Sequence, residues 1–277
     1  MKKSILKAAA VVGLLAVVAF AASQTVITVK GSDTMVILAQ RWAEKYMGAR
    51  SDVKIQVTGG GSGTGISALI NGTTDICNSS RPMKMSERDK LKERYSSLGV
   101  EVKVAKDGLA VYVQESNPVQ TLSLDQLNAI YTGKITNWKD VGGQDAKIVV
   151  YGRENSSGTH VYFRDFVLKG KDYTASMQTM PGTAAVVNAV SKDKFSIGYG
   201  GAAYATGVKF VKVSKKSGEA GYEPTAETVK AGHYPITRYL YLYLKSKPTG
   251  VMKEYIDWIL SPEGQATVSE VGYFPVK

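Results

Sequence analysis

Short β-branched runs alternate with longer stretches of helical periodicity along most of this chain, and no other property of the sequence restricts the fold as much. Three runs near the start are predicted strands, and helical stretches follow each of them. In order, these segments are VITVKG, TMVILAQRWAEKYMG, KIQVT, ISALING, DICNSS and KMSERDKLKER. Such a series folds into a sheet covered by helices, because each helix buries its apolar face against the strands. The sequence therefore predicts an α/β protein.

The same alternation begins again after a long β-rich run, GVEVKVAKDGLAVYVQ (99–114). The segments that follow are SLDQLNAIYTG, KIVVYGR, SGTHVYFRDFVLKG, TAAVVNAVSKDK and FSIGYGG. A second β-rich run, YPITRYLYLYLKSKP (234–248), precedes a final helical stretch that a Ser-Pro pair interrupts at 261–262. This repetition indicates two similar units joined by two long strands.

We therefore expect a two-lobed fold in which each lobe is a mixed sheet flanked by helices. Lobe 1 is expected to comprise residues 25–109 and 240–277, and lobe 2 residues 110–239. The two crossover strands would form the hinge, with motion near 107–112 and 237–242.

The first residues have the pattern of a secretory signal peptide. Three lysines precede an uncharged, mostly apolar stretch from Ala8 to Ala22, and Ala19-Phe20-Ala21 offers a cleavage site. This stretch is shorter than the roughly 18 to 20 residues that a membrane-spanning helix needs. We expect residues 1–21 to be a cleavable signal and the mature protein to be periplasmic or otherwise extracytoplasmic. An uncleaved anchor is the alternative.

Charge and cysteine usage narrow the class of protein. Cys77 is the only cysteine, so an intramolecular disulfide is excluded. The formal net charge is +11, which suggests an anionic partner. The basic residues are spread along the chain, and no basic stripe alternates with aromatic residues as in a nucleic-acid-binding surface. Nucleic acid is therefore not an expected partner.

Small hydroxyl residues gather where predicted strands lead into predicted helices, in the segments GSDTM (31–35), GGGSGTG (59–65) and RENSSGTH (153–160). A fourth segment, DICNSSRPM (75–83), ends a strand with two serines. A helix N-terminus carries unpaired N–H groups and about half a positive charge, so it binds an oxyanion without a lysine. In open α/β sheets such junctions gather at the carboxyl ends of the strands, where ligands bind.

Each junction also has a purely structural interpretation. Ser32 or Asp33 could serve only as a helix N-cap, and the glycines of 59–65 could form only a flexible turn. Arg153 stands four residues before Ser157 and adds a planar cation to a helix start, which favours anion binding. Arg81 follows Ser80 and could point into the site or toward solvent.

The sequence shows no catalytic constellation. His160 and His233 have no metal-ligand spacing with other candidate ligands. Ser62 lacks the G-x-S-x-G context of a hydrolase nucleophile, and the glycine segments match neither the nucleotide-binding P-loop nor G-x-G-x-x-G. We therefore expect no enzymatic activity, no metal and no cofactor.

The order of GSDTM, GGGSGTG, SSRPM and RENSSGTH, followed by IGYGG and DWILSPEGQ, resembles the periplasmic phosphate-binding proteins of the high-affinity bacterial phosphate importer. This resemblance spans nearly the whole mature chain. It implies a venus-flytrap receptor with the periplasmic-binding-protein fold, which closes on inorganic phosphate and delivers it to the membrane permease of an ABC importer.

The resemblance also implies the phosphate-binding residues. From the first lobe they are Ser32, Asp33, Thr34, Ser62 and Ser80, and from the second they are Arg153, Ser157, Gly158 and Thr159. Some well-known members of the family carry an aspartate at the end of the third strand that accepts the proton of bound phosphate, whereas this chain has Ser80 there. We hypothesise that Asp33 takes this role.

Three other functions remain open at this point. The protein could bind another tetrahedral oxyanion such as sulfate or molybdate, although the placement of Arg153 and Asp33 disfavours this. It could be an exported phosphoester hydrolase, or an adhesion protein that retains the fold without the ligand. For the receptor we expect a monomer.

Overall fold

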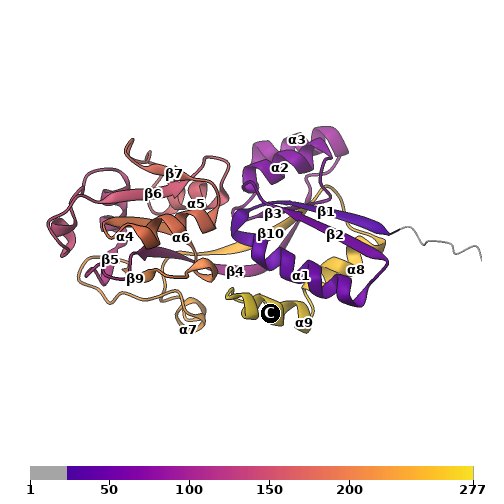
Figure 1. Ribbon diagram of the computed structural model, residues 1–277. Helices are drawn as coiled ribbons and strands as arrows, with labels where there is room; N and C mark the ends of the chain where they lie inside the picture. Colours follow the sequence, from indigo (N-terminus) through magenta and orange to yellow (C-terminus); the bar gives the residue numbers. More distant parts are fainter. Residues whose placement is uncertain (1–23, 277) are drawn as a thin grey trace, which may run out of the picture.

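The computed structural model describes residues 24–276 and shows the predicted α/β architecture (Figure 1). The strands are β1 (Thr25–Gly31), β2 (Val53–Thr58), β3 (Ile76–Ser79), β4 (Val100–Val113), β5 (Thr121–Ser123), β6 (Val149–Arg153), β7 (Gln178–Met180), β8 (Ser196–Gly201), β9 (Lys209–Ser214) and β10 (Thr237–Leu244). The α-helices are α1 (Val36–Ala49), α2 (Ser62–Asn71), α3 (Met85–Tyr95), α4 (Leu124–Tyr131), α5 (Gly158–Phe166), α6 (Thr183–Lys192), α7 (Ala226–Lys230), α8 (Gly250–Ile259) and α9 (Pro262–Val271). Short 3-10 turns form η1 (Asp33–Met35), η2 (Trp138–Val141) and η3 (Ala202–Tyr204).

Within residues 24–276 the strands form one mixed, ten-stranded sheet. Its main path runs in the order β2-β1-β3-β10-β4-β8-β6-β7, and β9 pairs with both β4 and β5. The pairs β1–β2, β1–β3 and β6–β8 are parallel, as helix crossovers between successive strands require. β10 is antiparallel to β3 and β4, so the sheet is mixed, as predicted.

Strand β4 connects two groups of elements. Its first part, from Val100 to Gly108, pairs with β10, and its last part, from Leu109 to Val113, pairs with β8. Figure 1 shows β1, β2 and β3 with α1, α2 and α3 on one side of this connection, and β6 and β7 with α4, α5 and α6 on the other. The two long β-rich runs of the sequence are thus the neighbouring strands β4 and β10.

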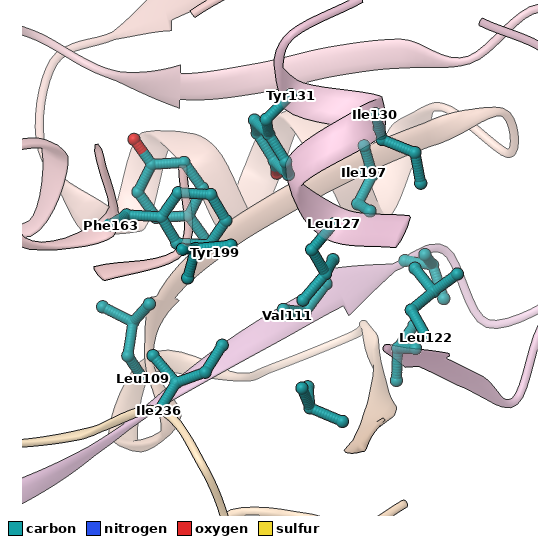
Figure 2. Close-up of a cluster of buried hydrophobic side chains, with 14 of the residues drawn as sticks. Leu109, Val111, Leu122, Leu127, Ile130, Tyr131, Phe163, Ile197, Tyr199 and Ile236 are labelled. Atoms are coloured by element: carbon teal, nitrogen blue, oxygen red, sulfur yellow. The ribbon is translucent and has the colours of Figure 1, made fainter. Parts of the chain in front are cut away.

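Each group has its own buried apolar cluster. One cluster contains Ile27, Leu38, Trp42, Leu240 and Ile256 among its members. The other is drawn in Figure 2 and includes Leu109, Val111, Leu122, Leu127, Ile130, Tyr131, Phe163, Ile197, Tyr199 and Ile236. Burying one aliphatic or aromatic side chain stabilises the folded protein by about 1.5–3 kcal/mol relative to leaving it exposed. Each cluster buries many such side chains, so each group of elements has a stabilising core of its own.

Local signals account for several helix ends. Ser123 and Gln126 form a capping box at the start of α4, in which Ser123 Oγ accepts from the Gln126 N–H at 3.2 Å and Gln126 Oε1 accepts from the Ser123 N–H at 2.9 Å. The predicted Ser-Pro break is the boundary between α8 and α9, where Ser261 caps α9 and Pro262 occupies its first turn.

The predicted signal peptide at 1–21 lies outside the described residues. Within residues 24–276, no helix combines the length and apolar character that a membrane span requires.

Candidate functional site

The hydroxyl-rich junctions predicted from the sequence meet in the structure. Ser62 Oγ lies 3.3 Å from Ser80 Oγ, and the Ser80 N–H donates to Ser62 Oγ at 3.0 Å. Thr34 Oγ1 lies 2.8 Å from Thr159 Oγ1, although 125 residues separate them in the chain. All four side chains are buried. Hydroxyls from both groups of elements therefore converge on one place.

The glycine segment 59–65 allows this close approach. Gly60 and Gly61 have φ angles of +110° and +93°, which residues with a side chain rarely adopt. A Cβ atom on Gly61 would lie 2.5 Å from the carbonyl oxygen of Ser156. Immediately beyond, the Gly63 N–H donates to that same oxygen at 2.9 Å. The segment is thus a tight turn that leads into α2 at Ser62, and its backbone contacts the loop before α5.

The N-terminus of α5 faces that of α2. Ser157 caps α5, because its Oγ accepts from the N–H groups of Thr159 at 3.2 Å and His160 at 3.3 Å. A Cβ on Gly158 would lie 2.3 Å from Ser62 Oγ and 2.7 Å from Ser80 Oγ. Only glycine at position 158 permits the observed contact, so the backbone of α5 reaches the serines directly.

Arg153, at the end of β6, supplies a buried cation to the site. Its Nε and Nη2 donate to the Glu154 carboxylate at 3.1 and 2.7 Å, and Nη1 donates to Thr183 Oγ1 at 2.9 Å. Nη2 also donates to Asp33 Oδ2 at 2.8 Å. A guanidinium has five N–H groups, so these contacts leave one N–H of Nη1 for a further acceptor.

Glu154 is held in its ionised form by this arginine. Burial alone would raise the pKa of the Glu154 carboxyl, but the hydrogen bonds and the charge of Arg153 outweigh burial and place the pKa below its usual range.

Asp33 lies in η1 and bridges the two groups. Its Oδ1 accepts from the Gly60 N–H at 2.8 Å, while Oδ2 is paired with Arg153. Its main-chain oxygen accepts from the Tyr204 hydroxyl at 2.5 Å. The Asp33 side chain makes no helix-capping hydrogen bond, and neither does that of Ser32. The capping interpretation of GSDTM therefore lacks support.

Ser32 is the remaining residue of this turn. Its Oγ is buried without a hydrogen-bond partner among the described residues. Buried hydroxyls usually have a partner, so this atom indicates that the turn can contact a ligand.

The structure answers the question about Arg81. Its guanidinium forms a paired contact with Glu87, with Nη1–Oε2 at 2.8 Å and Nη2–Oε1 at 2.7 Å. The Arg81 guanidinium therefore pairs with the start of α3 and not with the serine hydroxyls.

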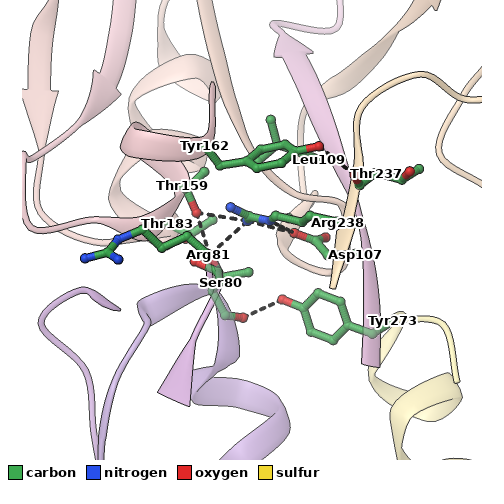
Figure 3. A network of polar contacts seen from close by, with 12 residues as sticks. Ser80, Arg81, Asp107, Leu109, Thr159, Tyr162, Thr183, Thr237, Arg238 and Tyr273 are labelled. Atoms are coloured by element: carbon green, nitrogen blue, oxygen red, sulfur yellow. Dashed lines mark hydrogen bonds and ion pairs between the residues drawn. The ribbon is translucent and has the colours of Figure 1, made fainter. Parts of the chain in front are cut away.

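Sequence reasoning missed another buried arginine, Arg238 on β10. Its Nη2 donates to Asp107 Oδ2 at 2.8 Å and to Thr159 Oγ1 at 3.0 Å (Figure 3). A signal was present for Arg238, which is an isolated charge within a strongly β-prone run, because a charge buried in a sheet needs a partner.

Hydroxyl groups, helix N-terminal N–H groups and one incompletely paired arginine can together surround a tetrahedral oxyanion. All nine predicted site residues lie in this region: Ser32, Asp33, Thr34, Ser62, Ser80, Arg153, Ser157, Gly158 and Thr159. Their individual contacts with a ligand stay predictions.

Comparisons with known proteins agree with this geometry. A family model described as a PBP superfamily domain matches residues 18–263. The phosphate-binding protein PstS of Pseudomonas aeruginosa is 34% identical over 263 residues, which cover 89% of this chain and 81% of that protein. PstS of Bacillus subtilis is 35% identical over 251 residues, covering 90% of this chain and 80% of that protein.

Solved structures give the same result. A putative phosphate ABC transporter substrate-binding protein from Clostridium perfringens, solved with bound phosphate, superimposes with a TM-score of 0.84 at 34% identity and covers 91% of this chain and 100% of its own. An ABC-type phosphate transport receptor from Vibrio cholerae has a TM-score of 0.73 at 29% identity, covering 91% of this chain and 100% of its own. The resemblance inferred from the sequence is confirmed, and the chain belongs to the PstS family of phosphate-binding proteins within the PBP superfamily.

Proposed function

We propose that this protein is the extracytoplasmic receptor of an ABC phosphate importer, which binds inorganic phosphate and delivers it to the permease. The observation that carries the proposal is the convergence of Thr34, Ser62, Ser80 and Thr159 beside Arg153, in a chain whose relatives are phosphate-binding proteins. The relatives are named as binding proteins and transport receptors, which agrees with the prediction that the chain is not an enzyme.

The ligand would bind between two lobes. The proposed lobe 1 comprises residues 25–109 and 240–277, and lobe 2 residues 110–239, with β4 and β10 as the hinge. Donors that come from both lobes reach one anion together only when the lobes close, so phosphate would favour the closed form. Support comes from the Thr34–Thr159 contact and from the Asp33–Arg153 ion pair, each of which joins the two proposed lobes.

Discrimination between phosphate and sulfate would depend on a carboxylate. Phosphate keeps at least one proton at neutral pH and sulfate has none, so a carboxylate acceptor favours phosphate and repels sulfate. Asp33 is the proposed acceptor, because its carboxylate lies next to Arg153 and the glycine turn.

We further propose that residues 1–21 are a cleaved export signal and that the mature receptor is a monomer in the periplasm or an equivalent space. Mass spectrometry of the exported protein tests the cleavage, and light scattering of the same sample tests the oligomeric state.

Calorimetric titration of phosphate into mature protein tests the proposed function. The protein is first unfolded and dialysed to remove carried ligand, then refolded and titrated with and without excess sulfate. Tight one-to-one binding that persists in sulfate is the expected result. Absence of binding heat, or heat abolished by sulfate, would contradict the proposal and point to another oxyanion or another class.

A further inference from the structure

A buried ion pair joins the two neighbouring long strands beneath the site. On β10, Arg238 donates from Nε and Nη2 to the same Asp107 oxygen of β4, at 3.0 and 2.8 Å. The side chains of Arg238 and Asp107 are 3% and 0% exposed. The pair is therefore almost wholly removed from water.

This ion pair is incompletely satisfied. Asp107 Oδ1 and Arg238 Nη1 are buried and have no hydrogen-bond partner among residues 24–276. Replacing a buried ion pair by apolar side chains often leaves a protein as stable or makes it more so. Stability alone is thus a weak reason for a charged pair at this position. The contacts of Arg238 with other residues suggest a second role for the pair.

Those contacts are with the two threonines of the site. Arg238 Nη2 lies 3.0 Å from Thr159 Oγ1 and 3.5 Å from Thr34 Oγ1, and the two threonine oxygens lie 2.8 Å apart. Figure 3 shows the Arg238 guanidinium between Asp107 and Thr159. One guanidinium nitrogen is thus close to hydroxyls from both proposed lobes.

Chemistry fixes the direction of the hydrogen bond between Arg238 and Thr159. A guanidinium only donates, so Thr159 Oγ1 must accept from Arg238. Asp107 and Thr159 are the nearest acceptors of the two Nη2 N–H groups, at 2.8 and 3.0 Å, and Thr34 is more distant at 3.5 Å. The hydroxyl proton of Thr159 is thereby directed away from Arg238, toward Thr34 or toward an anion in the site. Phosphate oxygens accept hydrogen bonds, so a threonine oriented in this way is ready to donate.

We infer that Arg238, held by Asp107, is a positioning residue that orients the Thr159 and Thr34 hydroxyls as donors to bound phosphate. The inference rests on the proposed function. Arg238 acts through the threonines, and Asp107 balances its charge so that the cluster adds little net charge next to the anion.

A double-mutant cycle tests the inference. Phosphate affinity is measured by calorimetry for the wild type, Arg238→Met, Thr159→Val and the double variant. Each single change is expected to weaken binding by about tenfold or more, because Thr159→Val removes the donor and Arg238→Met removes the group that orients it. If Arg238 acts through Thr159, the phosphate affinity of the double variant should be about equal to that of the single variant with the lower affinity.

Two further variants separate positioning from folding. Arg238→Lys keeps a cation beside Asp107, so this variant should fold even if Arg238→Met does not. It should still lose affinity, because an ammonium lacks the planar fork that reaches Asp107 and Thr159 together. Arg88→Met is the control, since Arg88 pairs with Glu101 at 2.7 Å and contacts none of the site hydroxyls, and it should leave phosphate affinity unchanged.

The possible results are distinguishable. A wild type that binds no phosphate would contradict the proposed function and this inference with it. A wild type that binds phosphate, together with an equally tight Arg238→Lys or Arg238→Met variant, would overturn the inference alone. Fully multiplicative losses in the double variant would also overturn it, because they would indicate that Arg238 and Thr159 act independently.

Discussion

Asp33 and Arg153 are paired across the site, with 2.8 Å between Asp33 Oδ2 and Arg153 Nη2, although 120 residues separate them in the chain. The pair places a carboxylate and a guanidinium side by side, where a protonated anion can use both. It also means that part of the hydrogen-bonding capacity of Arg153 is already used by Asp33.

Replacing Asp33 by asparagine is expected to reduce the preference for phosphate over sulfate. The amide keeps the size of the side chain, but it removes the negative charge that repels sulfate and supplies N–H donors that sulfate can accept from. Titration of each anion into Asp33→Asn measures the ratio of the two affinities. An unchanged ratio would show that Asp33 is not the proton acceptor.

Glu154→Gln is the matched control for Asp33→Asn, because Glu154 is the other carboxylate on Arg153. Glu154→Gln removes a carboxylate from the Arg153 guanidinium without changing the turn that contains Asp33. We expect it to alter the affinities for both anions in the same direction, with their ratio preserved.

Arg153→Lys is expected to weaken phosphate binding by about 10- to 100-fold, the range for loss of a charged hydrogen bond. An ammonium cannot contact Thr183, Asp33 and Glu154 together as the planar fork does. Calorimetry gives the affinity, and thermal unfolding without phosphate reports on the fold. Arg164→Lys is the control, because Arg164 is a half-buried arginine paired with its neighbour Asp165, and this variant should bind phosphate normally. Equal affinities in the two variants would contradict the role of Arg153.

Gly158→Ala is expected to impair phosphate binding by about tenfold or more while changing the stability of the ligand-free protein little. The added methyl group would lie 2.3 Å from Ser62 Oγ, and overpacking of this kind costs about 1–3 kcal/mol. If the lobes separate without ligand, the clash exists only in the closed form. Calorimetry and urea unfolding measure the two effects.

The control for Gly158→Ala is Gly48→Ala in α1, where an added Cβ meets nothing within 4 Å. This change should leave binding intact and raise the free energy of unfolding by about 0.5–1 kcal/mol, since alanine favours a helix over glycine. Tight phosphate binding by Gly158→Ala would argue against the proposed closure.

The stability of the protein should fall in acid partly through Glu154. Its pKa is lowered in the folded protein, so the unfolded chain takes up the proton more readily. The resulting stabilisation is present above the ordinary glutamate pKa of about 4.3 and is lost as the pH falls through the lowered folded value. Between neutral pH and pH 3, the free energy of unfolding measured with urea should decrease less for Glu154→Gln than for the wild type. Parallel curves would contradict this assignment.

Much of the fold follows from local sequence patterns. The runs that became β1, β2 and β4 are β-branched over several residues, and the boundary of α8 and α9 is marked by Ser261 and Pro262. Strands β5, β7 and β9 were not predicted, and β5 and β7 have only three residues each, too few to show a period. Such strands are defined by partners distant in the chain.

The site residues also divide into those that a local sequence pattern indicates and those that it does not. Ser62 and Ser157 were found because helix starts with small hydroxyl residues are local signals. The contact between Arg238 and Thr159 joins residues 79 positions apart, and Asp107 is 131 positions from Arg238, so no nearby pattern encodes them. The partner of Arg81 is only six residues away, at Glu87, but the same local sequence also allows Arg81 to point into the site or toward solvent.

Thr237 lies directly opposite Gly108 in the ladder between β4 and β10. Residues 109–236 therefore leave this ladder and rejoin it at neighbouring positions, like an insertion whose two ends meet. Segments with adjacent ends tolerate circular permutation and exchange, because the joints disturb little of the surrounding backbone. Exchange of this segment at the two joints would replace Arg153, Ser157 and Thr159 together and leave Thr34 and Ser62 in place.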